Sequence, residues 1–398
     1  MQSLTIWAWK GGGVYASSFN HIVMRNSTVS NNVAVGLGGG FLLLEHAVLN
    51  SHYCQWVGNE AGRNGGALAA VSATAEAYSD SFLQNTAMYV LSLSICVSVS
   101  LPDFDWPVHC HLSWLKLNLI RCDADLRNGG AVHVDSEARM NFSGALFRGN
   151  RADGSGGALR LEAAARSVVQ NSSFEHNFAL VRGGALSAGT DAAALFWRCV
   201  MDGNVGVRGG GALEAESTAV VQMLICRLRD NSAASGCGGA LLLESFASAT
   251  LLQCELLRNR VTTGLSLPRN LEQASRLEEG DSESRGGALC LTTSARVLGA
   301  ELLLAGNSAG RGGGAFVGVG ASLICGAAAP ALSSHGGGGS RVGQARLAGS
   351  CRFVGNKGVI EGGGLSMEWG ASVQLRGSAF RRNRAGAHGG AVYVPPLP

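Results

Sequence analysis

The chain has 398 residues, a formal net charge of +3 and only 15% charged residues. Glycine is abundant, with 58 residues against 7 prolines, but it follows no three-residue period, so a collagen triple helix is excluded. An apolar share of 46% with little charge argues against disorder. The weak positive balance gives no reason to expect nucleic acid or an anionic membrane as a partner.

The first residues lack the charged and apolar regions of a signal peptide. The longest apolar run, at 88–101, is shorter than the ~20 residues that a membrane-spanning helix needs. Because the repeat pattern described next starts at once and continues to the end, we expect the sequence to be a piece of a longer protein.

A Gly-Gly pair followed by a small or apolar residue recurs twelve times along the chain. Successive pairs mostly lie 26–28 residues apart, and three gaps are longer. The first glycines of the pairs are Gly12, Gly39, Gly65, Gly129, Gly156, Gly183, Gly210, Gly238, Gly286, Gly313, Gly363 and Gly389. The long gaps predict insertions at about 86–127, 261–284 and 325–345 within a single repeat domain that spans 1–398.

A second mark keeps step with the first. A large apolar residue is followed three positions later by asparagine, and this asparagine lies 20 or 21 residues after the first glycine in every coil except the one that begins at Gly313. The four central coils carry both marks: Gly156 and Gly157 with Asn177, Gly183 and Gly184 with Asn204, Gly210 and Gly211 with Asn231, and Gly238 and Gly239 with Asn259. We expect these residues to form the corners of one repeating structural unit.

Apolar residues alternate with variable ones on both sides of these corners. Leu159 and Leu161 follow a glycine pair, and Cys199 and Met201 precede an asparagine. A period of two indicates β-strands with one buried face. Glycine permits tight turns, and asparagine tolerates left-handed backbone and can form hydrogen-bonded ladders. The sequence therefore predicts an all-β parallel β-helix of about twelve coils with three insertions. A leucine-rich repeat is less favoured because no half-repeat has a helical pattern.

The paired marks GGA(L/V) and F-x-x-N, as at 156–159 and Phe174–Asn177, resemble the polymorphic outer membrane protein repeat family. The resemblance covers nearly the whole chain outside the insertions. It implies a right-handed parallel β-helix of the pectin-lyase-like type with an adhesive role. It also implies an extracellular or cell-surface location, which would be the outer membrane in a bacterium. Similar repeats occur in glycine-rich proteins of algae and other protists.

Five cysteines share one position, five residues before the asparagine. They are Cys54, Cys199, Cys226, Cys254 and Cys351. We expect a core column that accepts small residues, with neighbouring coils close enough for disulfides. A straight column cannot surround a metal ion tetrahedrally, so we expect no metal site there.

Charged residues form two further columns. Carboxylates occur six positions after the first glycine in five coils: Glu45, Asp135, Glu162, Glu216 and Glu244. Basic residues precede the glycine pair in several coils: Lys10, Arg63, Arg127, Arg182, Arg208, Arg285 and Arg311. We interpret both columns as solvated outer surface whose charges offset each other. Calcium could relieve repulsion at Asp135 and Glu162 or at Glu216 and Glu244, and no other cofactor is expected.

The strongest candidate for chemistry is the group His133, Asp135, Arg160 and Glu162 on neighbouring coils. A polysaccharide lyase would need a basic group beside calcium-binding acids, and a hydrolase would need paired carboxylates. These four residues supply the types but match no recognisable motif. We therefore expect no catalytic residue and a non-enzymatic protein that binds a protein or carbohydrate through its flank. A carbohydrate-active enzyme and a purely structural rod are the alternatives.

Overall fold

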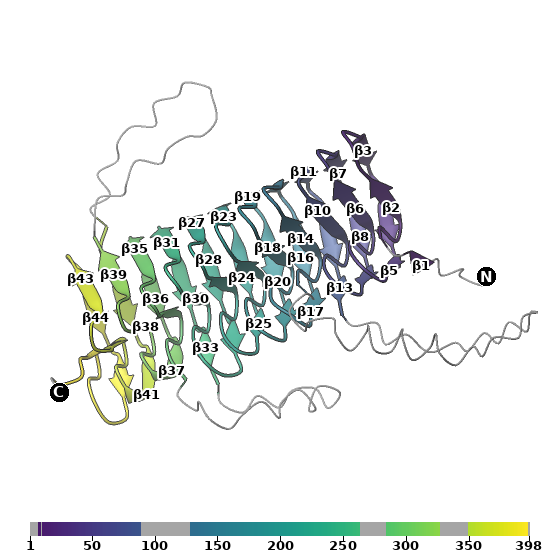
Figure 1. Cartoon of the computed structure of the whole chain (residues 1–398). Coiled ribbons are helices and arrows are strands. Elements are labelled where there is room, and N and C mark those ends of the chain that lie inside the picture. Colours follow the sequence, from purple (N-terminus) through teal and green to yellow (C-terminus); the bar gives the residue numbers. More distant parts are fainter. Residues whose placement is uncertain (1–6, 9, 89–127, 263–283, 327–348, 397–398) are drawn as a thin grey trace, which may run out of the picture.

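Each repeat of the chain winds once around a common axis, and successive coils stack into a rod (Figure 1). The structure is a computed structural model that describes residues 7–8, 10–88, 128–262, 284–326 and 349–396. Every strand pairs in parallel with its counterpart in the next coil, which gives two sheets of 12 strands and two of 11. The predicted all-β fold, a parallel β-helix, is confirmed, with about 11 complete turns and a partial twelfth. A leucine-rich repeat is excluded, because the described residues form no helix.

Two sheets correspond to the strands that the sequence predicts. Sheet B follows the glycine pairs: β2 (Val14–Ala16), β6 (Phe41–Leu44), β10 (Leu68–Val71), β14 (Val132–Asp135), β18 (Leu159–Leu161), β22 (Leu186–Ala188), β26 (Leu213–Ala215), β30 (Leu241–Leu243), β34 (Leu289–Leu291), β38 (Ala315–Val317), β42 (Leu365–Met367) and β46 (Val392–Tyr393). Sheet D precedes the asparagines: β4 (Thr28–Ser30), β8 (Gln55–Val57), β12 (Ser81–Leu83), β16 (Leu146–Arg148), β20 (Ser173–Glu175), β24 (Val200–Asp202), β28 (Arg227–Arg229), β32 (Glu255–Leu257), β36 (Leu303–Ala305), β40 (Arg352–Val354) and β44 (Ala379–Arg381).

Two more sheets complete each coil. Sheet C lies between B and D: β3 (His21–Arg25), β7 (Val48–His52), β11 (Thr74–Tyr78), β15 (Arg139–Ser143), β19 (Arg166–Gln170), β23 (Ala193–Trp197), β27 (Val220–Leu224), β31 (Ser248–Leu252), β35 (Arg296–Ala300), β39 (Ser322–Cys325) and β43 (Ser372–Leu375). Sheet A follows the asparagines: β1 (Trp7–Ala8), β5 (Val33–Ala34), β9 (Glu60–Ala61), β13 (Thr86–Ala87), β17 (Arg151–Ala152), β21 (Phe178–Ala179), β25 (Val205–Gly206), β29 (Ser232–Ala233), β33 (Arg260–Val261), β37 (Ser308–Arg311), β41 (Lys357–Glu361) and β45 (Arg384–Ala385).

The coils extend slightly into the segments that we predicted as insertions. Thr86 and Ala87 form β13, Val261 ends β33, and Cys325 ends β39, so these residues belong to the coils. Ser284 also belongs to a coil, because its carbonyl accepts a hydrogen bond from the Arg311 amide at 2.9 Å. The remaining predicted insertions lie outside the described residues, in the segments 89–127, 263–283 and 327–345.

The interior of the rod is filled by identical positions of successive coils. The middle residues of the sheet D strands form one such column, in which Trp56, Phe82, Phe147 and Phe174 are fully buried. Their rings stack in parallel, with centroids 4.6 Å apart between Phe147 and Phe174. This distance is close to the ~4.8 Å spacing of hydrogen-bonded strands. Parallel pairing therefore places each ring on the one below, and the core repeats with the coil.

The asparagines form a continuous buried ladder at the corner between sheets D and A. Asn204 donates from Nδ2 to the Phe174 carbonyl at 2.9 Å and to Asn231 Oδ1 at 2.9 Å. Its own Oδ1 accepts the backbone and side-chain amides of Asn177 at 3.0 and 2.9 Å. The same contacts join Asn32, Asn59, Asn85, Asn150, Asn177, Asn204, Asn231, Asn259, Asn307, Asn356 and Asn383. Each asparagine thus satisfies a backbone corner that no strand partner reaches.

The conformational role that we assigned to these asparagines needs correction. The left-handed backbone lies on the residue before each of them, such as Gly203 with φ 62° and His176 with φ 53°. The ladder asparagines themselves do not have positive φ. Asparagine is required at the corner for its amide rather than for its backbone freedom.

The two glycines of each pair have different tasks. Gly183 has φ 65°, a left-handed conformation in which an added side chain is strained. Gly184 lies against the next coil, where a Cβ atom would lie 2.2 Å from the Gly211 carbonyl oxygen. In 209–211 the corner glycine is Gly210, the second of three, but in the other triple-glycine coils the left-handed residue is the first, as at Gly38 and Gly312. The corner is therefore one residue earlier there than the sequence indicated.

The third coil has a shorter segment between its left-handed glycine and its asparagine than the regular coils. Counted from the left-handed glycine, the asparagine is 21 residues on in the second coil (Gly38 to Asn59) and in the fourth (Gly129 to Asn150), but 20 in the third (Gly65 to Asn85). The missing residue lies in the turn between sheets B and C. Ser72 and Ala73 alone join β10 to β11, whereas three residues join β6 to β7 and β14 to β15.

We predict that Asn204→Ala lowers the free energy of unfolding by about 3 kcal/mol or more, because several buried backbone and amide groups lose partners at ~1–3 kcal/mol each. Urea denaturation followed by circular dichroism measures the change. Asn383→Ala is the control, since its side chain is half-buried at the end of the ladder and freed groups there reach water. Equal effects of both substitutions would contradict the ladder.

The glycine pair allows a second test. Gly184→Ala should prevent folding or cost well over 2 kcal/mol, because the added carbon meets backbone atoms that cannot move independently. Gly355→Ala should cost about 1–2 kcal/mol, because its φ is 62° but no atom lies within 4 Å of the added carbon. Thermal melts of both variants would distinguish the destabilisation caused by close contact with the next coil from that caused by backbone strain at positive φ. A smaller effect at Gly184 than at Gly355 would refute the proposed close packing.

Candidate functional site

The outward-facing column of sheet B is buried, although we expected solvated surface on this flank. His133 alternates with the core residues Val132 and Val134, so its side chain points away from the interior. Its exposed fraction is nevertheless 2%, and that of Arg160 in the next strand is 7%. Ser187 and Glu214 continue the column and are also buried. A line of polar groups is thus enclosed on the outside of the sheet.

The structure brings the four residues of the candidate cluster together. The Nε2 atom of His133 lies 3.8 Å from Asp135 Oδ2 and 3.8 Å from Glu162 Oε2. Asp135 ends β14 and Glu162 directly follows β18 in the next coil, and both carboxylates are half-buried. The side-chain contact with His133 lowers the pKa of Asp135 below its usual value, against the effect of burial.

Arg160 is held in place by hydrogen bonds. It donates from Nε to Glu162 Oε1 at 2.9 Å, from Nη1 to the Ser187 hydroxyl, and from Nη2 to Glu216 Oε1 at 3.3 Å. Burial alone would lower the pKa of Arg160, but the charges of Glu162 and Glu214 outweigh it and raise the pKa above its ordinary value. The guanidinium is therefore a permanent cation that orders the acids around it.

Glu214 is a buried carboxylate that the sequence analysis missed. It accepts a hydrogen bond from the Ser187 hydroxyl at 2.5 Å and one from Arg182 Nη1 at 3.4 Å. Burial, together with repulsion from Glu216, raises the pKa of Glu214, while Arg160 and Arg182 oppose this. The available signal was a charged residue between Leu213 and Ala215 in a strand whose other positions are apolar.

The remaining acidic column is neutralised by arginine along part of its length. Arg182, one of the predicted basic residues, donates to Glu244, and Thr292 donates to the same carboxylate at 3.4 Å. Glu216 is paired with Arg160. The repulsion that we expected between Glu216 and Glu244 is thus relieved by two guanidinium groups. Of the other basic residues, Arg127 lies outside the described residues.

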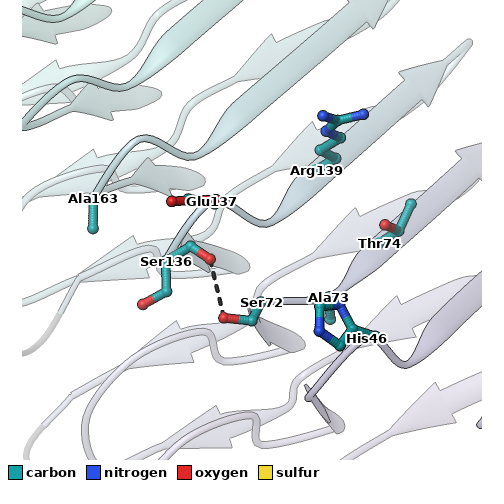
Figure 2. A pocket seen from close by; sticks show the side chains of 8 residues that line it. All are labelled: His46, Ser72, Ala73, Thr74, Ser136, Glu137, Arg139 and Ala163. Atoms are coloured by element: carbon teal, nitrogen blue, oxygen red, sulfur yellow. Dashed lines mark hydrogen bonds between the residues drawn. The ribbon is translucent and has the colours of Figure 1, made fainter. Parts of the chain in front are cut away.

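A hollow of about 680 Å³ opens beside the short turn of the third coil (Figure 2). Its lining residues are His46, Ser72, Ala73, Thr74, Ser136, Glu137, Arg139 and Ala163. Figure 2 shows Ser72 below Ser136, and the Ser72 hydroxyl donates to the Ser136 carbonyl at 3.1 Å. His46 and Glu137 occupy the turn position that the third coil lacks, so the hollow results from the missing residue. Its volume lies within the ~300–1,000 Å³ of small-ligand sites.

Aromatic side chains gather around the same coils. Phe19 is 78% exposed and stacks on His46 at the edge of the hollow, with ring centroids 5.1 Å apart. At the other end of the sheet C strands His52 and Tyr78 stack with centroids 4.7 Å apart. Tyr53, in the adjoining turn, is 66% exposed.

Polar side chains occupy the face between these rings. Asn50 lies 3.0 Å from a ring nitrogen of His21 through its amide, and Glu76 accepts hydrogen bonds from the Tyr78 hydroxyl at 3.1 Å and from Asn141 at 3.5 Å. We call the outward residues of β3, β7, β11 and β15, with the hollow and its adjoining rings, the sheet C platform.

The cysteine column is buried, as the sequence indicated. Cys54, Cys199, Cys226 and Cys254 are buried free thiols in the core. Cys351, at the same position of its coil, forms a disulfide with Cys325. A second disulfide joins Cys237 to Cys290.

Asp80 fills the cysteine position in the third coil, and the sequence analysis missed it. It is fully buried and accepts hydrogen bonds from the Ser51 hydroxyl, the Cys54 amide at 2.8 Å and the Trp56 indole at 3.2 Å. Burial raises the pKa of Asp80 even so. The column therefore accepts a carboxylate where donors surround it.

Comparison of the chain with protein families, curated proteins and solved structures finds no match to any of them. In the described part of the chain there is no helix long and apolar enough to cross a membrane. The function must therefore be argued from the site itself.

We predict that the Glu214→Gln variant gains stability relative to the wild type as the pH rises. The raised pKa means that Glu214 contributes most to stability below the ordinary glutamate pKa of about 4.3 and loses that contribution at higher pH. The wild type should thus lose stability relative to the variant as the pH rises above about 4.3, through the raised pKa of Glu214. Urea titrations at several pH values measure this, with Glu60→Gln on the exposed surface as control. A constant difference between wild type and variant would refute the assignment.

Proposed function

We propose that the chain is a non-enzymatic binding protein of the cell surface or extracellular space, and that the sheet C platform holds a carbohydrate. The observation that carries this proposal is the joint presence of exposed rings, amides and a carboxylate on adjacent strands next to a hollow. A sugar has an apolar face of C–H groups that packs on aromatic rings, and hydroxyl edges that need planar polar partners.

The rod provides the rigidity that such a site needs. Outward side chains of sheet C stand in rows ~4.8 Å apart, because each strand is hydrogen-bonded to the next. Little conformational entropy is then lost on binding, since the backbone is already ordered. Inward positions repeat from coil to coil, whereas outward positions such as Asn50, Glu76 and Asn141 differ. This distribution is typical of a constant scaffold with a variable binding surface.

Two further inferences belong to the proposal. The paired glycine and asparagine marks support membership of the polymorphic outer membrane protein repeat family. The disulfides Cys237–Cys290 and Cys325–Cys351 support an oxidising, extracellular compartment, because such bonds are rare in a reducing cytosol.

The alternative of a carbohydrate-active enzyme draws on the proximity of His133, Asp135, Arg160 and Glu162. Catalysis by Arg160 as a base is disfavoured, because its guanidinium is buried, hydrogen-bonded and held in the charged form. Asp135 and Glu162 keep one face toward solvent and are the residues that a substrate could reach. Turnover of uronic-acid polymers, with or without calcium, that is abolished by Asp135→Ala would favour the enzyme over the binding protein.

We predict that the purified chain binds immobilised glycans on an array, and that Tyr78→Ala weakens the binding at least about ten-fold by removing a stacking ring. Insertion of one glycine after Ser72 should also abolish or reduce binding, because it restores the usual turn length and fills the hollow. Trp369→Ala, an exposed ring in a distant coil, is the matched control.

Two results would contradict the carbohydrate proposal. The first is glycan binding that both Tyr78→Ala and the glycine insertion leave unchanged. The second is an array without signal although circular dichroism shows a folded chain, which would favour a protein ligand or a purely structural rod.

A further inference from the structure

The polar column outside sheet B contains a group of ligand atoms that the proposed binding function does not use. We propose that His133, Asp135 and Glu162 bind a divalent transition-metal ion of the zinc class. One nitrogen and two oxygen atoms of these residues lie within 4.8 Å of one another. The proposal is independent of the carbohydrate site, because none of the three residues lines the hollow.

Each carboxylate is anchored through one oxygen and presents the other. Asp135 Oδ1 accepts the Ser136 amide at 2.6 Å, and Glu162 Oε1 accepts two hydrogen bonds from Arg160. Asp135 Oδ2 and Glu162 Oε2 are the atoms that face the imidazole. Anchoring by a second group is the usual way in which metal-binding carboxylates are oriented.

The burial and weak hydrogen bonding of the His133 ring also indicate a ligand at this position. Its side chain is 2% exposed, and Nε2 faces both carboxylate oxygens at 3.8 Å, too far for a hydrogen bond to either. The only hydrogen bond that the described residues give the ring is a long one of 3.4 Å between Nε2 and the Asn64 amide nitrogen, and Nδ1 has no partner. Nε2 is thus buried with only a weak partner, and a metal bond there would offset the desolvation cost of that atom, while Nδ1 would keep its own.

The distances suit a metal ion. With sides of 3.8, 3.8 and at most 4.8 Å, the point equidistant from the three ligand atoms lies at most about 2.5 Å from each of them, and about 2.2 Å if the third side is also 3.8 Å. This interval spans the ~2.0–2.2 Å of zinc bonds and the ~2.3–2.6 Å of calcium bonds, so size alone does not choose between them. Ligand chemistry does, because calcium prefers oxygen ligands throughout whereas imidazole suits zinc and its neighbours.

The charge of the surroundings favours a cation as well. The contacts that run along the column join two guanidinium groups, those of Arg160 and Arg182, with the buried Glu214, whose protonated form burial favours, and with four further carboxylates, those of Asp135, Glu162, Glu216 and Glu244. Asp135 and Glu162 lie at the end of the column, away from Arg182. Both remain half-buried, so positions for water or an outside ligand stay open on the ion.

The test is titration of the full chain with zinc chloride by isothermal calorimetry, with calcium chloride in parallel. We expect one zinc ion per chain, bound at least about ten-fold more tightly than calcium. His133→Gln and Asp135→Asn should each weaken zinc binding at least about ten-fold. Glu244→Gln, an acid of the same column outside the site, should leave it unchanged.

Cobalt provides a readout that does not depend on affinity. Bound cobalt should give the weak visible bands of nitrogen and oxygen ligands, without the intense near-ultraviolet absorption of thiolates, because the free cysteines of the described residues, Cys54, Cys199, Cys226 and Cys254, are buried elsewhere in the core. If His133→Gln fails to fold, Asp135→Asn on the half-exposed side decides the question. The proposal is overturned by zinc binding that both variants leave intact, by a thiolate spectrum, by tighter binding of calcium, or by no binding.

Discussion

The structure depends on the asparagine ladder at the corner between sheets D and A. A parallel β-helix must turn the chain several times per coil, and every turn leaves backbone groups that the strand ladders cannot satisfy. Here one buried side chain per coil satisfies them, and it also bonds the equivalent side chain of the next coil, as Asn204 does with Asn177 and Asn231. A shift of any coil by one residue would break the ladder, so the asparagines fix the register of all four sheets together.

A fixed register explains both the core and the surface. Because identical positions stack at one strand spacing, a ring such as Phe147 lies on Phe174, and His133 lies beside Arg160. The same rule places the acids of sheet B in a column, where two arginines neutralise them along part of its length. Two departures from the repeat carry the two proposals: the short turn at Ser72 opens the hollow, and His133 places an imidazole nitrogen among carboxylates.

The sequence predicted the fold well because its signals are local and repeated. Gly156, Gly157 and Asn177 recur in phase, and this phase alone requires stacked coils. Sheets A and C were not predicted, because the two-residue strands of sheet A are too short for a pattern and the outer positions of sheet C vary. The burial of Arg160 and Glu214 also could not be predicted, since it depends on side chains from other coils that cover the sheet. The glycine-to-asparagine distance of 20 residues in the third coil was the signal for the short turn that opens the hollow. The same distance is counted in the second coil when its triple glycine is read from Gly39, so the third coil did not stand out in the sequence.

The stacking of coils is tested most directly by distances along the rod. Spin labels attached through an unnatural ketone amino acid at positions 50 and 222, and at 50 and 374, would leave the cysteines untouched. Asn50, Gln222 and Gln374 occupy one outward column of sheet C, five and nine coils apart. Pulsed electron resonance should then give separations of roughly 24 and 43 Å, in the ratio of the coil counts. A second distance equal to or shorter than the first would show that the coils do not stack in one straight column.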